Sequence, residues 1–206
     1  MKYLKLLGIS LPVVLGLIAF PANAGAAGPV LCAVQESPCP EASKWTTGTT
    51  LDFTLKSGTK AKLAATEGES LDECTGSTAK GKIEKSEAVT GPIESLTWSG
   101  CTFTTKTLNA GKLEVEHIAG THNGTVVADG TTEVTINTVL YGSCIYGATA
   151  GTDLGELKEG KPATFVANAV LKKLAGSAVA CPETAKWTAE YALTEPSEKT
   201  LSVETG

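Results

Sequence analysis

The stretch CPETAKWTAEYALT, residues 181–194, decides the fold class. Its apolar and polar side chains alternate, which is typical of a β-strand with one buried face. The side chains expected to face inward are Trp187, Ala189, Tyr191 and Leu193. Pro182 lies just before the alternating run, where no hydrogen-bond donor of a sheet ladder is needed.

Similar alternation recurs in residues 51–56, 112–118 and 133–142, and the turn triplets NAG, HNG, ADG and GTD separate such runs. Residues 168–176, NAVLKKLAG, are the best helix candidate, but their neighbours favour another strand. We expect an all-β fold of about ten short antiparallel strands. The predicted architecture is β-sandwich-like and stapled by disulfides, and two small β units are the alternative.

The opening motif has a near copy at residues 39–46, CPEASKWT. The similarity fades on both sides, so a duplicated domain is not favoured. Each copy instead predicts the start of a strand, with a disulfide before it and a tryptophan, Trp45 or Trp187, over the core. The two strands would be pseudo-equivalent and lie in facing sheets.

The first 24 residues have the parts of a secretory signal peptide: two lysines, an apolar run over residues 6–20 and a small-x-small site at residues 22–24. The apolar run is shorter than the roughly 20 residues that span a bilayer, so we expect cleavage and an extracellular location, with no membrane span in the mature chain. Cleavage leaves residues 25–206 as a single β-rich domain, with a possible boundary near residues 106–112.

The mature chain of 182 residues would carry 15 lysines, no arginine and 22 acidic residues, a net charge of −7. Such a chain matches phosphate backbones poorly, so we expect no nucleic-acid binding.

Six cysteines follow the signal peptide, an even number that suits a disulfide framework in an exported protein. Chain order favours three local pairs, although fifteen connectivities are possible. The expected pairs are Cys32–Cys39, Cys74–Cys101 and Cys144–Cys181. A cysteine metal site is disfavoured because the chain has no Cys-x-x-Cys pair.

Several of these segments together resemble a family of uncharacterised secreted, cysteine-containing proteins of soil actinobacteria. The segments are LCAVQESPCP, TLKSGTKAKL, ESLTWSGC, LYGSCIYG, GKPATFVANAVLKKLAGS and CPETAKWTAEYALTEP. The resemblance covers nearly all of the mature chain, and the Cys-Pro…Trp-Thr-Ala ending is its most specific part. It implies an exported, β-rich, disulfide-bonded protein and brings no catalytic residues with it. The absence of arginine departs from the usual look of the family.

Candidate catalytic and metal-binding residues are few. His117 and His122 could bind a metal with a carboxylate as the third ligand, but a core histidine and a hairpin turn are the favoured interpretations. No Gly-x-Ser-x-Gly elbow, phosphate loop or calcium loop occurs, and the 22 acidic residues are expected to be mainly solvated surface charge. We therefore predict no catalytic residues, no cofactor and no metal.

The three tryptophans, Trp45, Trp98 and Trp187, could form a sugar-stacking platform, but core anchors are favoured, and Trp98 is expected to pack on a disulfide. The leading hypothesis is a non-catalytic secreted or cell-envelope protein that acts by surface association or as a structural module. Its partners would be cell-wall or extracellular glycans or proteins. A carbohydrate- or ligand-binding module and a secreted hydrolase are the two alternatives.

Overall fold

The computed structural model describes residues 28–197 and 199–206, and these residues confirm the predicted all-β class. The elements are β1 (Pro29–Cys32), η1 (Glu41–Ser43), β2 (Thr50–Leu55), β3 (Ala61–Ala65), β4 (Ser70–Lys82), β5 (Thr90–Cys101), β6 (Thr104–Asn109), β7 (Lys112–His117), β8 (Gly124–Ala128), β9 (Thr132–Thr138), β10 (Gly142–Ala148), β11 (Asp153–Lys158), β12 (Thr164–Lys173), β13 (Thr184–Glu195) and β14 (Ser202–Thr205). The best helix candidate of the sequence lies mostly in strand β12, as its neighbours indicated.

The strands do not form the two facing sheets of the predicted sandwich, because one sheet closes into a barrel. The ring runs β2, β4, β5, β7, β8, β11, β12, β13 and returns to β2, which pairs with both β13 and β4. Phe53 of β2 lies opposite Leu193 of β13 on one side and Ala79 of β4 on the other. Side-chain alternation sets which residues face inward, but it does not determine whether the first and last strands of a sheet meet.

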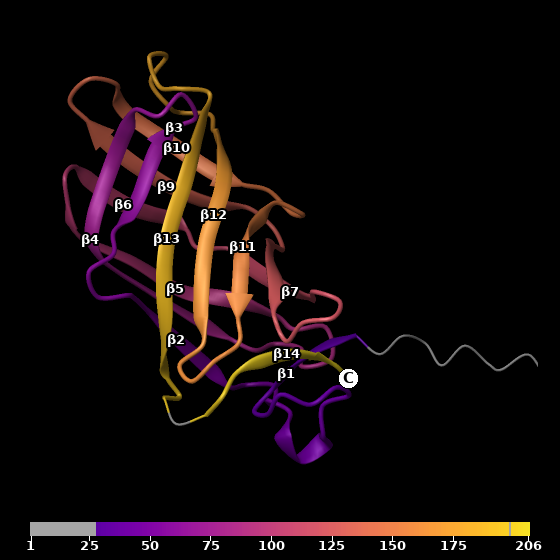
Figure 1. The fold of residues 1–206 in the computed structure, drawn as a ribbon. Coiled ribbons are helices and arrows are strands. Elements are labelled where there is room, and N and C mark those ends of the chain that lie inside the picture. The colour runs from indigo at the N-terminus through magenta and orange to yellow at the C-terminus, as the bar shows by residue number, and fades with distance from the viewer. Residues whose placement is uncertain (1–27, 198) are drawn as a thin grey trace, which may run out of the picture.

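Four strands, which we call the upper strands, extend the barrel beyond this ring: β3, β6, β9 and β10. β3 pairs with β13 and β4, the same two strands that β2 pairs with further down. β10 pairs with the end of β12, β9 pairs with β10, and β6 pairs with β9. Figure 1 shows β10, β9 and β6 in the upper part of the molecule, with the long strands β4, β13 and β12 passing in front.

Side chains, not a backbone ladder, join β6 to β5 in the described part of the chain. The Trp98 indole N–H donates to the Thr107 hydroxyl at 3.0 Å, and that hydroxyl donates to the Leu96 carbonyl at 2.8 Å.

The two ends of the described chain pair with each other, as β1 and β14, at the lower end of the barrel (Figure 1). Leu31 of β1, Val203 of β14 and Leu201 just before β14 are buried in the same core cluster as residues of the ring. The backbone N–H of Val203 also donates to the His122 carbonyl at 2.9 Å. The β1–β14 pair therefore packs against the lower end of the barrel.

The three disulfides join the cysteines in the order that the sequence predicts. Cys32–Cys39 lies beside the β1–β14 pair, Cys74–Cys101 links β4 to β5, and Cys144–Cys181 ties β10 to the loop before β13.

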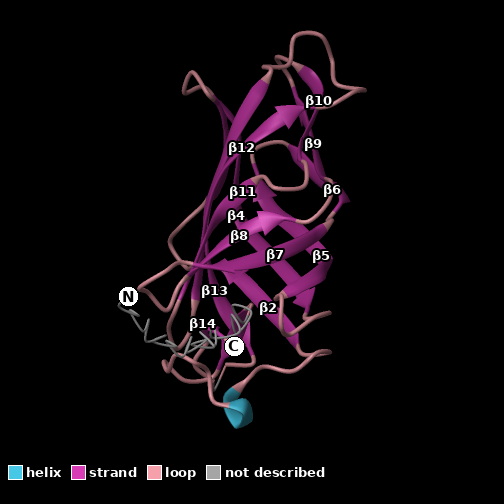
Figure 2. Ribbon diagram, turned by 90° about the vertical axis from the view of Figure 1, so that its right-hand side faces the viewer, coloured by secondary structure: helices cyan, strands magenta, loops and turns pink. Residues whose placement is uncertain are grey.

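The two copies of the repeated motif have different structures, which corrects the prediction of two equivalent strands in facing sheets. The copy at Cys181 leads directly into β13, as expected. The copy at Cys39 forms the short helix η1 and a single bridge at Lys44, and β2 begins only at Thr50. Figure 2 shows η1 beyond the lower ends of the strands. β2 and β13 are hydrogen-bonded neighbours in one sheet.

The predicted signal peptide, residues 1–24, lies outside the described residues. Among the residues that are described, no helix is long and apolar enough to span a membrane. The predicted domain boundary near residues 106–112 falls between β6 and β7, and both strands belong to the same sheet.

Candidate functional site

The barrel interior contains a cavity of about 190 Å³. Phe53, Ala79 and Leu96 occupy inward-facing positions on three neighbouring strands and line this cavity, yet each keeps accessible surface. An inward-facing residue with remaining accessible surface borders space that other side chains do not fill.

The cavity forms where small residues on β4 face larger side chains on other strands. Ala79 and Gly81 occupy successive inward positions of β4 and line the cavity. Their neighbour Gly91 on β5 must be glycine, because a Cβ there would lie 1.8 Å from the Lys82 carbonyl oxygen. The close approach of the two strands therefore requires glycine at position 91, whereas positions 79 and 81 are small without such a constraint.

A cluster of aromatic rings forms one side of the cavity, on β5, β12 and β13. The Trp187 ring lies 6.4 Å from the Trp98 ring, 6.1 Å from Phe165 and 6.3 Å from Tyr191, in edge-to-face arrangements. Phe165 and Tyr191 stack at 6.1 Å. These rings give the cavity an apolar wall suited to an aromatic or aliphatic molecule.

The Tyr191 hydroxyl in this wall already has a protein partner. It lies 3.0 Å from the Ser77 hydroxyl, which donates in turn to the Thr97 carbonyl at 2.8 Å, so the Tyr191 hydroxyl donates to Ser77. Burial raises the pKa of Tyr191 to about 12, although the Ser77 hydrogen bond acts in the opposite direction. The phenol is therefore neutral at physiological pH.

Asp72 is a buried carboxylate that also lines the cavity, and its two oxygens are both occupied. Its Oδ1 accepts from the backbone N–H groups of Glu73 at 2.9 Å and Phe103 at 3.0 Å, and its Oδ2 accepts from the Thr105 hydroxyl. Asp72 thus attaches the start of β6 to β4. This is a structural role that the sequence analysis did not identify.

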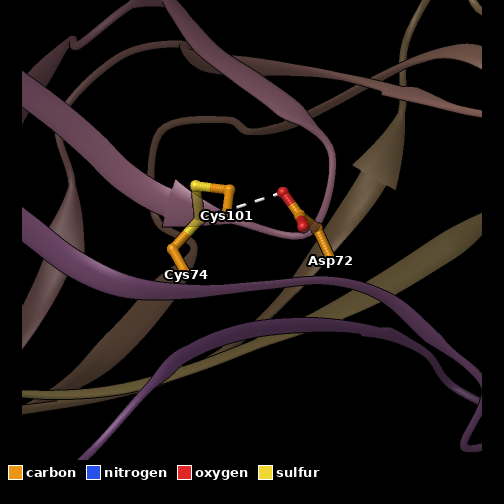
Figure 3. Close-up of side chains that lie close together, drawn as sticks. All are labelled: Asp72, Cys74 and Cys101. Atoms are coloured by element: carbon orange, nitrogen blue, oxygen red, sulfur yellow. Dashed lines mark hydrogen bonds between the residues drawn. A yellow bond between two sulfur atoms is a disulfide. The ribbon is translucent and has the colours of Figure 1, made fainter.

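Asp72, Cys74 and Cys101 are the one group of three potential metal ligands within reach of each other in the described part of the chain. The two sulfurs form a disulfide, as Figure 3 shows, so they are not thiolates and cannot bind a metal as such.

The two histidines have separate partners at the lower end of the barrel. His117 Nε2 lies 2.8 Å from the Thr121 carbonyl, and His122 Nδ1 lies 2.7 Å from the buried Glu204 carboxylate. Within the described residues, neither belongs to a group of three potential metal ligands. The two-histidine metal site that the sequence left open is therefore not assembled there.

The predicted tryptophan anchors fall into two classes. Trp45 is almost completely buried, at 5% exposure, in the main core cluster. Trp98 and Trp187 are half-buried and line the cavity, and Trp98 packs in the same cluster as the Cys74–Cys101 disulfide, as expected. They form part of an internal wall and not an external platform for sugars.

The Trp187 indole nitrogen has a feature that the sequence could not show. Five buried side-chain polar atoms in the described residues have no hydrogen-bond partner: Trp45 Nε1, Asp52 Oδ1, Glu159 Oε2, Trp187 Nε1 and Glu204 Oε2. Of the five residues, Trp187 is the one that lines the cavity.

No protein-family model, curated protein or solved structure matched this chain significantly.

Proposed function

We propose that the protein binds a small apolar molecule, about the size of one or two fused aromatic rings, inside the barrel. The observation that supports this most directly is the cavity of about 190 Å³ with its wall of aromatic rings. For comparison, an engineered apolar cavity of roughly 150 Å³ in another protein binds benzene. A cavity of the present size suits a ligand slightly larger than benzene.

The buried groups Asp72 and Tyr191 in the cavity wall favour a neutral ligand. The Asp72 carboxylate is occupied by three donors, and the Tyr191 phenol donates to Ser77. Neither group is free to pair with a ligand charge, and a charge buried without a partner is costly. We expect neutral rings to bind and their ionised analogues to be excluded.

The site of action in this proposal is outside the cytoplasm, where the protein would carry or sequester its ligand. The support is the set of three disulfides, because such bonds persist in oxidising compartments. No catalytic step is included.

The direct test is calorimetric titration of the purified, oxidised protein with naphthalene and with 1-naphthoate, which has the same rings and a negative charge. We expect saturable one-to-one binding of naphthalene and none of 1-naphthoate at the same concentrations. Absence of naphthalene binding, or equal binding of both compounds, would contradict an apolar internal site.

A second candidate function, association with an extracellular surface, is favoured by an exposed apolar tip. The tip consists of Val139, Leu140 and Val179, which are 92%, 70% and 96% exposed. The Cys144–Cys181 disulfide holds the two loops of the tip together. Exposed apolar clusters often mark interaction sites.

Sedimentation with cell-wall material tests this second candidate. The wild-type protein should pellet, and the double variant Val139→Ser/Val179→Ser should stay in solution. Val170→Ser is the control, because Val170 is 49% exposed on strand β12 and belongs to neither loop. If the wild-type protein remains in the supernatant, association with the cell wall is ruled out.

A further inference from the structure

The apolar tip formed by Val139, Leu140 and Val179 concentrates the exposed hydrophobic surface of the molecule. In the described part of the chain, these are the three most exposed of the large hydrophobic side chains, and Leu108 and Val170 follow at 54% and 49%. Aliphatic side chains gathered in water at one place usually mark a contact with a protein or with a membrane. The shape, charge and size of the tip decide between these two partners.

The tip lies at the end of the barrel opposite the β1–β14 pair, and its shape is fixed. Its two loops connect β9 to β10 and β12 to β13, and both lie at the top of the molecule in Figure 1. Besides the Cys144–Cys181 disulfide, the Ala178 N–H donates to the Ser143 carbonyl at 2.9 Å, which holds one loop against the other. The aliphatic side chains are thus presented by a backbone that is already ordered, which lowers the cost of binding.

The chain around the tip carries no charge over two long stretches. Residues 134–152 and 174–182 contain no lysine, aspartate or glutamate, although charged residues make up 19% of the sequence. Beside the second stretch, Lys173 and Glu183 neutralise each other as an ion pair. A charged group is costly in hydrocarbon, whereas an uncharged loop can lie at the boundary between head groups and acyl chains. The tip can therefore enter an apolar phase without burying a charge.

The size of the tip also fits a lipid surface better than a folded protein. A stable protein interface takes roughly 800 Å² and about 20–30 residues from each partner, far more than the tip supplies. Its three side chains have about ten carbon atoms in all, somewhat fewer than a myristoyl chain, which gives marginal and reversible membrane binding. A fluid acyl layer needs no matching shape, so a small protruding tip is sufficient for it.

We propose that the apolar tip inserts into the head-group and upper acyl region of a lipid bilayer and anchors the barrel there reversibly. This proposal rests on the second candidate function, because it names acyl chains as what the tip contacts. The Tyr141 hydroxyl, next to the tip, donates to the Glu69 carboxylate, so an acidic group lies on that side. The whole sequence is acidic as well, with a net charge of −5. We therefore expect stronger binding to zwitterionic than to anionic lipids.

Flotation of the purified, oxidised protein with phosphatidylcholine vesicles is the direct test. The wild-type protein should float with the vesicles. Val139→Ser/Val179→Ser should lower the partition coefficient at least about tenfold, because it removes about four methyl groups from the lipid contact. Val170→Ser is the matched control and should bind like the wild type, since Val170 is exposed on β12 outside both loops. Vesicles that contain phosphatidylglycerol should bind the protein less.

A fluorescence measurement shows whether the tip reaches the acyl chains. Leu140→Trp places a reporter in the tip, and vesicles of lipid brominated on its acyl chains should quench the added emission. The wild-type emission comes from Trp45, Trp98 and Trp187, which lie inside the barrel or its core, and should change little. Quenching requires contact with the acyl chains, so binding to head groups alone would leave the emission of Leu140→Trp unchanged and contradict insertion.

The outcomes separate this proposal from the second candidate function. If the wild-type protein does not float but still pellets with cell-wall material, the lipid proposal is overturned and surface association stands. Failure in both assays overturns both. Flotation that Val139→Ser/Val179→Ser retains in full would show that the tip is not the contact. A wild-type dimer in sedimentation velocity that this double variant dissociates would mean that a second copy covers the tip, which also contradicts the proposal.

Discussion

Replacing Ala79 by leucine should stabilise the protein and block the cavity. Ala79 faces the interior from β4, between Phe53 of β2 and Leu96 of β5 in the sheet register. All three residues line the cavity, so a leucine side chain at position 79 would extend into space that is empty.

The size of the effect follows from three added carbon atoms. Each buried carbon contributes about 0.8 kcal/mol, or roughly 2.4 kcal/mol in total. Fixing the leucine side chain costs about 0.5–1 kcal/mol of rotamer entropy. The free energy of unfolding should therefore rise by about 1.5 kcal/mol. In a core that is already filled, the same substitution would lower it by about 1–3 kcal/mol, so the sign of the change is diagnostic.

The assay combines urea unfolding, followed by tryptophan fluorescence, with calorimetric titration of naphthalene. Ala192→Leu is the matched control, because it adds the same atoms to β13 next to Thr54 and Thr164, at a position that does not line the cavity. We expect Ala192→Leu to change stability by less than about 0.5 kcal/mol and to leave binding unchanged. A destabilised Ala79→Leu variant that still binds naphthalene with full affinity would refute the hollow interior.

Three further predictions concern groups around the barrel. Burial raises the pKa of Tyr191 to about 12, whereas the unfolded chain ionises near pH 10, so stability should be complete below pH 10 and fall between pH 10 and 12 by up to about 2.7 kcal/mol. Tyr191→Phe should remove this part of the alkaline loss in rapid urea titrations. Cys144→Ala/Cys181→Ala opens a loop with a sequence separation of 37 and should cost about 4 kcal/mol in guanidinium unfolding, by the chain-entropy relation. Asp72→Ala leaves the Phe103 N–H without its acceptor and should cost about 2–4 kcal/mol, with faster hydrogen exchange of that amide.

The strands could be predicted from the sequence because their signal is local. Alternation in residues 51–55 and 187–193 assigns the inward faces of β2 and β13 correctly, down to the cavity-lining Phe53 and Tyr191. The repeated motif shows the limit of this reasoning. Cys39 and Cys181 precede nearly identical residues, yet only the second copy has partner strands on both sides.

Barrel closure and the cavity could not be predicted, because both depend on pairings between distant segments. Residues 50–54 pair with residues 78–82, and nothing in either segment encodes that register. An alanine at position 79 is unremarkable in a sequence and becomes a cavity wall only when Phe53 and Leu96 lie beside it. The unpaired Trp187 nitrogen likewise depends on which rings surround it.

The stability cost of the cavity supports its use as a binding site. At about 24 cal/mol per Å³ of unfilled volume, a cavity of about 190 Å³ costs a fold at most roughly 4–5 kcal/mol. This is comparable to what the Cys144–Cys181 disulfide contributes by the loop-closure relation, and small domains are stable by only about 5–15 kcal/mol. A single leucine at position 79 would remove part of that cost, whereas a bound ligand would offset it by adding binding energy to the folded state alone. Naphthalene should therefore raise the melting temperature of the wild-type protein but leave that of Ala79→Leu unchanged.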